Sequence, residues 1–277
     1  MTPSRLSTLA AHLQASYAKG LACSDADPVR TRARRISDLV LSLLLPGYFH
    51  SDEPSNPNIE IRLSNLRAAL TSCGQPDLAI DDVLDELTEV RELVRTDVEA
   101  AFANDPAAID RDVVIASYPC IEALAVQRFA HHLYRRGVPM LPRMMTEQVH
   151  SRTGIDIHPG AQIGESFFID HGTGVVIGET AVIGRNCVLY QGVGLIAWNP
   201  LAKDDNGELR RGHSNKRHPE LQDHVTVYAG ASILGGDTVI GHHSVIGGNV
   251  WLTHSVEPWS VVSNKDPELN IRTRKAR

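Results

Sequence analysis

The sequence predicts an α+β protein with an α-helical N-terminal domain followed by a parallel β-helix of hexapeptide repeats. Aliphatic residues recur every third or fourth position before residue 150, and every sixth position after residue 155. A period near 3.6 is typical of an amphipathic helix, whereas a period of six is typical of the parallel β-helix. We therefore divide the chain into a helical domain at 1–150, a β-helix domain at 151–262 and a C-terminal tail at 263–277.

The six-residue repeat occupies residues 155–252 in four frames, which an accidental spacing in a β-sandwich would not give. Each repeat supplies one short strand and one turn, three repeats make a triangular coil, and the aliphatic residue points inward. The expected inward residues are Ile157, Ile163, Ile169, Ile177, Ile183, Leu189, Leu221, Val227, Ile233, Ile240, Ile246 and Leu252.

The repeat is interrupted at three places. Two extra residues separate Ile169 from Ile177, one separates Ile233 from Ile240, and a loop is inserted at 194–217. Insertions in a solenoid leave as loops on one face, and loops held by a rigid scaffold often carry function. We therefore expect the functional site beside these interruptions.

The helical part is expected to contain several amphipathic helices. Apolar spacing predicts them around residues 6–17 and 36–44, over 59–72 and 80–102, and from Pro119 to about residue 135. Asp105 is expected to be the N-cap of a further helix, with Pro106 in its first turn.

Composition excludes some classes of protein. A formal net charge of -6 over 277 residues argues against a dedicated nucleic-acid binder. The N-terminus has no continuous apolar segment and the chain has no long apolar run, so neither secretion nor membrane insertion is expected. Its four cysteines are scattered without a CxxC pair, which favours reduced thiols and a cytoplasmic location.

Polar residues that are able to carry chemistry cluster at the interruptions. His171 lies at the first one, and a neutral imidazole, which ordinarily titrates near pH 6.5, can act as a general base. Asp156 precedes His171 by somewhat less than one coil, so its carboxylate could orient the ring from the adjacent coil. Spacing alone leaves open the interpretation that both are corner residues.

Several motifs in one order resemble the serine O-acetyltransferase family of hexapeptide-repeat acyltransferases. They are DIHP at 156–159, DHGTGVVIGETAVI at 170–183 and RHP at 217–219, and in the helical part DPA at 105–107 and YRRG at 134–137. The resemblance covers roughly residues 100–256. It implies that the β-helix is left-handed and that the enzyme transfers acetyl from acetyl-CoA to the L-serine hydroxyl, giving O-acetylserine for cysteine biosynthesis.

The resemblance also implies roles for individual residues. His171 would be the general base and Asp156 its orienting partner, while Asp105 and Asp170 would receive the serine ammonium group. Arg217 and His218 would hold the serine carboxylate, which a guanidinium binds bidentately. Glu179 would lie near the acceptor. His158 is expected to have a structural role in a turn.

For acetyl-CoA, the resemblance implies backbone contacts at Ala197, Ala229 and Gly248. The family's glycine-rich run is replaced here by 194–198 and a longer insertion, so the contact at Ala197 departs from the pattern. We interpret Arg210, Arg211 and Lys216 in this insertion as a solvated charge run rather than as phosphate ligands. No metal is expected.

Two other activities fit parts of the pattern. The first is a hexapeptide acetyltransferase that acts on a sugar or another small hydroxyl acceptor. The second is a β-helix metalloenzyme resembling the γ-class carbonic anhydrases, which need three histidines converging at a subunit interface. The candidates would be His158, His171, His218, His242 and His243.

The resemblance further implies association into a homotrimer or a dimer of trimers, with the active site between neighbouring chains. Family members that dock to O-acetylserine sulfhydrylase insert a terminal isoleucine. This sequence ends in RKAR at 274–277, so we expect no such docking.

Overall fold

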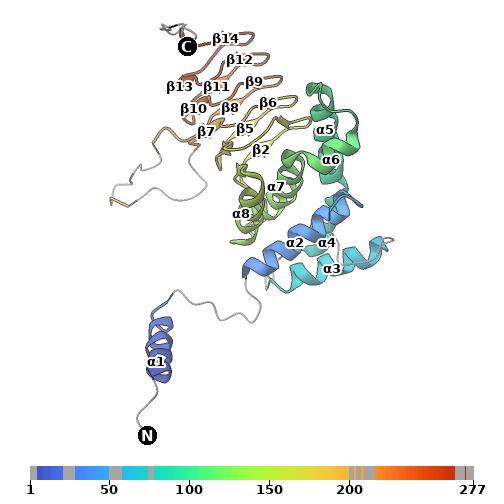
Figure 1. Cartoon of the computed structure of the whole chain (residues 1–277), viewed down its shortest axis with the longest axis vertical. Helices are drawn as coiled ribbons and strands as arrows, with labels where there is room; N and C mark the ends of the chain where they lie inside the picture. The colour runs from blue at the N-terminus through green and yellow to red at the C-terminus, as the bar shows by residue number, and fades with distance from the viewer. Residues whose placement is uncertain are drawn as a thin grey trace, which may run out of the picture.

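The computed structural model describes residues 5–20, 29–49, 58–73, 78–199, 203, 207–208, 216–265 and 272. The helices come first along the chain, and the short strands stack above them as a narrow column (Figure 1). The helices are α1 (Arg5–Tyr17), α2 (Val29–Leu44), α3 (Ile59–Thr71), α4 (Ile80–Asp85), α5 (Leu87–Asn104), α6 (Arg111–Ser117), α7 (Pro119–Arg135) and α8 (Leu141–Thr153).

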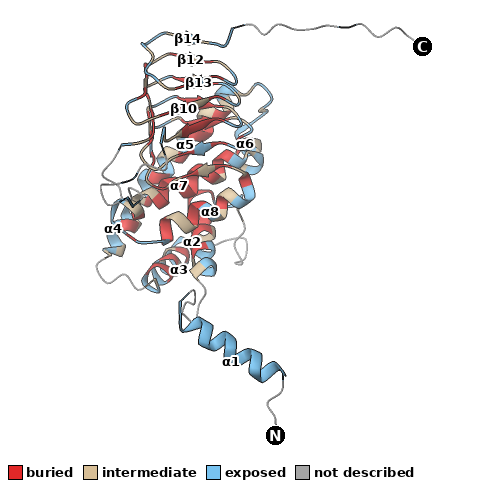
Figure 2. Cartoon of the chain, turned by 90° about the vertical axis from the view of Figure 1, so that its left-hand side faces the viewer, coloured by how far each residue is buried: buried red, intermediate tan, exposed pale blue. Residues whose placement is uncertain are grey.

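The helices from α2 onward form one packed unit around α7, whose inward face is almost completely buried. Helix α1 differs, because none of its residues is buried and it stands apart from the rest (Figure 2). Among the described residues no single helix is long and apolar enough to cross a membrane, although α6 and α7, bent by 74° to each other, pass the same test as a pair.

Two expectations for the helical part were wrong. The helix expected over 80–102 is broken at Glu86 into α4 and α5. Asp105 is not an N-cap: it is the C-cap of α5, and Asp110 caps α6 by accepting a hydrogen bond from the Val113 amide. The reason is local, since the Asp105 side chain accepts from the Ala107 amide and closes a turn instead of starting a helix.

The second part is a left-handed parallel β-helix, as expected. Its two- or three-residue strands pair in parallel and form three sheets. Sheet A contains β1 (Asp156–Ile157), β4 (Val176–Ile177), β7 (Gly194–Ile196), β10 (Ser232–Leu234) and β13 (Trp251–Leu252). Sheet B contains β2 (Gln162–Ile163), β5 (Val182–Ile183), β8 (Glu220–Leu221) and β11 (Val239–Ile240). Sheet C contains β3 (Phe168–Ile169), β6 (Val188–Leu189), β9 (Thr226–Val227), β12 (Val245–Ile246) and β14 (Val261–Val262).

The sixth-position aliphatics stack on one another inside the coil, which confirms the repeat. Ile157 is in register with Ile177, and Ile163 with Ile183, and all four are at most partly exposed. The structure adds Leu195 to this column, because β7 continues sheet A above β4. The loop expected at 194–217 therefore begins after Ile196, and Gly194 to Ile196 belong to the coil.

Turns join the sheets along three edges of the prism, which we call the A–B, B–C and C–A edges after the sheets that they connect. The first interruption of the repeat lies on the C–A edge between β3 and β4. The long insertion lies on the A–B edge between β7 and β8. These two edges carry nearly all of the candidate site residues.

Side chains of the helical part cover the open end of the β-helix. The first coil has backbone carbonyls with no coil beneath them, and such groups need partners when buried. Arg128 on α7 donates to Ile163 O at 3.0 Å and Gly164 O at 2.7 Å, and its guanidinium is held by the fully buried Asp97. Gln127 donates to Ala161 O at 3.0 Å in the same way. This contact fixes the β-helix against α5 and α7.

Candidate functional site

His171 lies on the C–A edge with its side chain 70% exposed, immediately after Asp170. Its backbone is left-handed (φ 59°), and the Gly172 amide donates to Asp170 O at 2.7 Å. A side chain at Gly172 would meet Ile155 Cδ1 at 2.5 Å, so only glycine fits after the histidine. The turn therefore holds the imidazole outward. Its Nδ1 lies 3.5 Å from Asp170 Oδ1.

Asp105 joins His171 at this edge from the loop between α5 and α6. Its carboxylate accepts hydrogen bonds from the Tyr118 hydroxyl and from the Ala107 amide at 2.8 Å. The Tyr118 hydrogen bond, the amide and the nearby His171 lower the pKa of Asp105. The same hydrogen bond, together with burial and the negative charges of Asp105 and Asp170, raises the pKa of Tyr118 to about 12. Two carboxylates thus face one imidazole.

The next coil of the C–A edge carries Tyr190 and Gln191, and Tyr190 stacks on Tyr228 of the coil above it, with ring centroids 5.0 Å apart. Ala229 follows Tyr228, Gly248 lies in the coil after that, and the Asn249 amide donates to Ala229 O at 2.9 Å. Gly248 is exposed and Ala229 is half-buried, so little side-chain bulk covers the backbone at these two positions. The predicted acetyl-CoA positions Ala229 and Gly248 therefore lie on the same edge as the predicted general base. Ala197 lies instead where the insertion begins, on the A–B edge.

The A–B edge holds the other predicted group. Arg217 forms an ion pair with Glu179, which also accepts a hydrogen bond from Tyr134 on α7. The Arg217 and His218 amides both donate to Thr180 Oγ1, at 2.9 and 3.0 Å. Arg217 and His218 are therefore held by the turn that follows β4.

His218 is buried, at 8% exposure, and its Nδ1 accepts from the Thr180 amide at 3.1 Å. Burial and the positive charges of Arg217, His158 and Lys216 lower its pKa to about 4. A side chain at Gly178 would meet the His218 ring at 2.0 Å, so the ring packs directly on glycine backbone. A neutral imidazole is the form that this environment favours.

Lys216, which was expected to belong to a solvated charge run, is exposed and also contacts the protein. Its ammonium donates to Thr180 O at 3.0 Å, and burial lowers its pKa. It also lines a cavity of about 560 Å³ between α7 and sheet B, beside Tyr134 and Glu179. Arg210 and Arg211 lie outside the described residues, as do Arg274, Lys275, Ala276 and Arg277.

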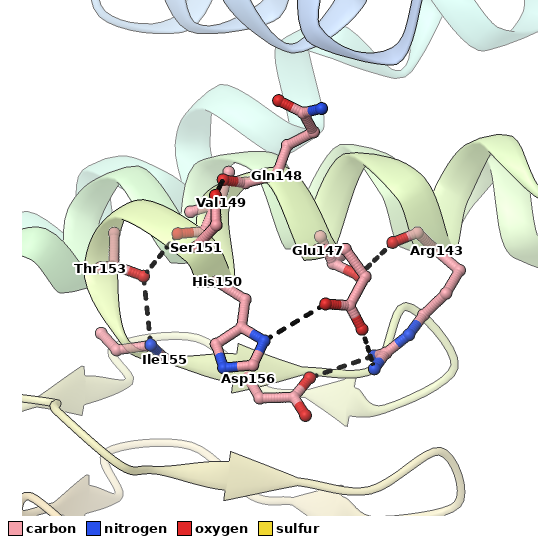
Figure 3. Close-up of polar contacts among 10 residues, drawn as sticks. Arg143, Glu147, Gln148, Val149, His150, Ser151, Thr153, Ile155 and Asp156 are labelled. Carbon is pink, nitrogen blue, oxygen red and sulfur yellow. Dashed lines mark hydrogen bonds and ion pairs between the residues drawn. The ribbon is translucent and has the colours of Figure 1, made fainter. Parts of the chain in front are cut away.

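Asp156 is not in contact with His171 within one chain. Its side chain points from the start of sheet A toward α8, where Arg143 contacts it at 3.1 Å (Figure 3). Arg143 also pairs with Glu147, whose other oxygen lies 3.3 Å from His150 Nδ1. The expected hydrogen bond to His171 is absent because the two side chains leave the coil from different places, Asp156 from face A and His171 from the C–A edge.

Glu147, His150 and Asp156 are also the one group of three potential metal ligands found within the ranges that the structure describes. The guanidinium of Arg143 already contacts both carboxylates, which explains the cluster as an ion-pair network (Figure 3). His158 belongs to a turn, because its Nδ1 accepts from the Gly160 amide at 3.0 Å and its ring packs edge-on against Tyr134.

Sequence reasoning missed three residues of these clusters. Thr180 lies inside the motif at 170–183, so its position next to Glu179 was a signal that could have been used. Tyr118 precedes Pro119, which favours an extended backbone and aims the tyrosine out of the helix. Arg143 carried no signal, because its contact with Asp156 joins two separate elements.

The chain is similar to proteins named serine acetyltransferase. It is 52% identical over 177 residues to the "Serine acetyltransferase, plasmid" of Synechococcus elongatus, covering 64% of this chain and 54% of that relative. It is 41% identical over 169 residues to the serine acetyltransferase of Staphylococcus xylosus, covering 61% of this chain and 72% of that relative. No family model matches the chain.

A solved structure agrees with these relatives. Serine acetyltransferase 1 of Entamoeba histolytica in complex with L-cysteine superposes with a TM-score of 0.73 at 32% identity, covering 85% of this chain and 98% of that chain. The chain thus spans about half the length of the first of these relatives but 72% of the second. On these similarities and on its helical domain and β-helix, the chain belongs to the serine acetyltransferase family.

Proposed function

We propose that this protein is a serine O-acetyltransferase, which transfers the acetyl group of acetyl-CoA to the hydroxyl of L-serine with His171 as general base. The observation that carries the proposal is the composition of the C–A edge. An exposed imidazole lies beside two carboxylates there, on the same edge as the small residues Ala229 and Gly248.

The charges of the two clusters match the two ends of a free amino acid. Asp105 and Asp170 supply anionic oxygens for an ammonium group. Arg217 supplies a guanidinium for a carboxylate, with Glu179 and Thr180 fixing its position. The L-cysteine in the Entamoeba structure differs from serine by sulfur in place of oxygen, and it supports a small amino acid as the ligand.

The two clusters lie on different edges of one prism, so a single chain supplies separate halves of this site. Trimeric packing of β-helices is the arrangement that would bring the C–A edge of one chain against the A–B edge of its neighbour. We therefore propose a homotrimer, or a dimer of trimers, whose site contains His171 from one chain and Arg217 and His218 from another. Ala197, on the A–B edge, would then face the acetyl-CoA positions of the neighbour.

In the proposed reaction, His171 Nδ1 faces Asp170, which leaves Nε2 for the serine hydroxyl. Nε2 takes the hydroxyl proton while the serine oxygen bonds to the thioester carbon. A backbone amide stabilises the oxyanion, the carbon–sulfur bond breaks, and the CoA thiolate recovers the proton from the imidazolium.

The role of Asp156 stays a prediction. Within one chain its partner is Arg143, and the carboxylate nearest to the imidazole is Asp170. Since Asp156 faces outward from sheet A, an orienting contact with His171 requires a neighbouring chain to bring that face against the C–A edge. Replacing Asp156 by Asn tests this role, because an orienting carboxylate affects kcat more than the serine KM.

The experiment that tests the function is thiol release from acetyl-CoA across a panel of acceptors. We expect rapid release with L-serine and only background release with D-serine, L-alanine and simple sugars. Equal release with sugars would support the alternative of another hydroxyl acceptor. Bound zinc and hydration of carbon dioxide would support the alternative of a metalloenzyme, and elemental analysis of the purified protein measures the metal directly.

Two further expectations accompany this function. We expect no binding to nucleic acid. We also propose a cytoplasmic location, in which the thiols of Cys120 and Cys187 would stay reduced.

A further inference from the structure

Tyr118 lies where the loop that carries Asp105 approaches the β-helix. It is half-buried between α6 and α7, and Pro119 holds its backbone in an extended conformation. Its hydroxyl donates to Asp105 Oδ2, while the Ala107 amide donates to Asp105 Oδ1. The two oxygens of this carboxylate are therefore fixed by two different donors.

The surrounding loop gives Asp105 little other support. Its neighbours Pro106, Ala107 and Ile109 are exposed, with Ile109 at 80%. The far end of the loop is tied down by Arg111, which pairs bidentately with Glu99 at 2.7 Å. The Tyr118 hydroxyl thus connects the start of the loop to the packed helices, and Ala108 packs against the core further along it.

The electrostatics of the cluster point the same way. The negative charges of Asp105 and Asp170 raise the pKa of Tyr118, and the charge of His171 lowers the pKa of Asp105. A phenol that stays protonated remains a hydrogen-bond donor next to these carboxylates. Hydrogen bonds to an ionised acceptor are stronger than those between neutral groups.

We propose that Tyr118 is a positioning residue for the amino acid substrate: its hydroxyl holds the Asp105 carboxylate in the orientation that receives the substrate ammonium group. This proposal rests on the proposed function. It predicts that the phenol acts on amino-acid binding through Asp105 and has no part in acetyl-CoA binding or in proton transfer.

The test is Tyr118→Phe, which removes one oxygen and keeps the ring. The expected result is a rise of about tenfold in the KM for L-serine, because a hydrogen bond to a charged group is lost. The KM for acetyl-CoA and kcat are expected to change less than about twofold. A fall in kcat together with equal rises in both KM values would contradict a positioning role.

Tyr48→Phe is the matched control. Tyr48 also donates its hydroxyl to a carboxylate, that of Asp112, but this pair lies at the end of α2 and outside both clusters. It is expected to leave both KM values unchanged. Thermal unfolding of both variants measures the stability that each hydrogen bond supplies, so a general loss of fold is recognised.

A double-mutant cycle with Asp105→Asn separates this inference from the proposed function. If Tyr118 acts through Asp105, adding Tyr118→Phe to Asp105→Asn produces no further rise in the serine KM. If Tyr118→Phe raises the serine KM by the same factor in the Asp105→Asn variant as in the parent protein, the inference is overturned. If Asp105→Asn alone leaves serine binding unaffected, the assignment of Asp105 in the proposed function fails first, and the inference with it.

Discussion

The C–A and A–B edges are built from the same repeat, yet they prepare a ligand site in opposite ways. On the C–A edge His171 is 70% exposed, and Ala229 and Gly248 further along this edge carry little or no side chain. On the A–B edge His218 is 8% exposed, and Thr180 fixes it through several hydrogen bonds. The proposed general base is thus left accessible, whereas the residue proposed to hold the substrate carboxylate is fixed in place.

Short and long insertions therefore have different effects on the β-helix. Two extra residues after Ile169 turn an imidazole outward without burying it. The long insertion before Arg217 returns the chain against the turn that follows β4, where Lys216, Arg217 and His218 all contact Thr180. Exposure suits a proton transfer, and rigidity suits the recognition of a charge.

The largest effect is expected from His171→Ala on the exposed edge. Loss of the general base should lower kcat by about 10²–10⁴, while the oligomeric state stays unchanged. His224→Ala is the matched control, because His224 is also a corner histidine with a left-handed backbone (φ 61°) but lies on the B–C edge. Steady-state kinetics and light scattering measure both quantities. An unaltered kcat in His171→Ala would reject its assignment as the base.

The next effect concerns the locked edge and comes from Gly178→Ala. The new methyl group would overlap the buried His218 ring, so the ring must leave its hydrogen bonds to Thr180. Overpacking of this kind costs about 1–3 kcal/mol in the free energy of unfolding, and we expect the serine KM to rise as well. Urea denaturation and kinetics measure the two.

Gly194→Ala is the control for that variant, because a side chain there meets its nearest neighbour at an ordinary 3.4 Å. It should unfold at nearly the parental urea concentration. Equal destabilisation of the two variants would show that His218 is not locked by its contact with Gly178.

A smaller effect is expected from pH. The pKa of His218 is about 4 in the folded chain and near 6.5 when unfolded, so below pH 6.5 the unfolded state binds a proton that the folded state does not. The stability that the neutral ring contributes is complete above that value and declines as the pH falls toward 4. Between pH 7.5 and 5.5 this one group should lower the free energy of unfolding by about 1 kcal/mol.

Urea denaturation at the two pH values measures the change, and His218→Gln isolates the contribution of this ring from that of the other histidines. The variant should show a pH dependence smaller by the same amount. An identical pH dependence in the parent and the variant would contradict the assignment.

The smallest effect is expected from Gly248→Leu on the C–A edge. The leucine would cover backbone groups that we propose for acetyl-CoA, so the KM for acetyl-CoA should rise by about threefold to tenfold, equivalent to one hydrogen bond. The serine KM should not change. A rise in the serine KM alone would show that this edge contributes to serine binding and not to acetyl-CoA binding.

Much of the fold was predictable because the repeat is local. Every coil reuses the same six-residue spacing, so Ile157, Ile163 and Ile169 could be assigned to the interior without knowledge of any partner. The position of His171 at an interruption was predictable for the same reason. Helix α8 ends at Thr153, and the first strand of the β-helix begins at Asp156.

The remaining errors come from contacts between distant segments. Asp105 matched the local pattern of an N-cap, but its acceptors are occupied by Ala107 and Tyr118, and the latter hydrogen bond joins two separate elements. Asp156 was expected beside His171 from their separation along the chain; within one chain Arg143 on α8 contacts that carboxylate, and the orienting role of Asp156 stays a prediction. Spacing fixes the coil of a residue more reliably than the direction of its side chain.

The sequence by itself determined the period, the inward residues and the edge on which each interruption falls, since all of these follow from counting along a regular coil. Tertiary structure alone decided which polar groups meet: Tyr118 with Asp105, Arg128 with the open carbonyls of the first coil, and His218 with Gly178. The reason is physical. The backbone groups of one repeat form their hydrogen bonds with the neighbouring coil, which lies at a fixed distance in sequence. A buried side-chain hydrogen bond or ion pair, in contrast, can be completed by any segment that folding brings within reach.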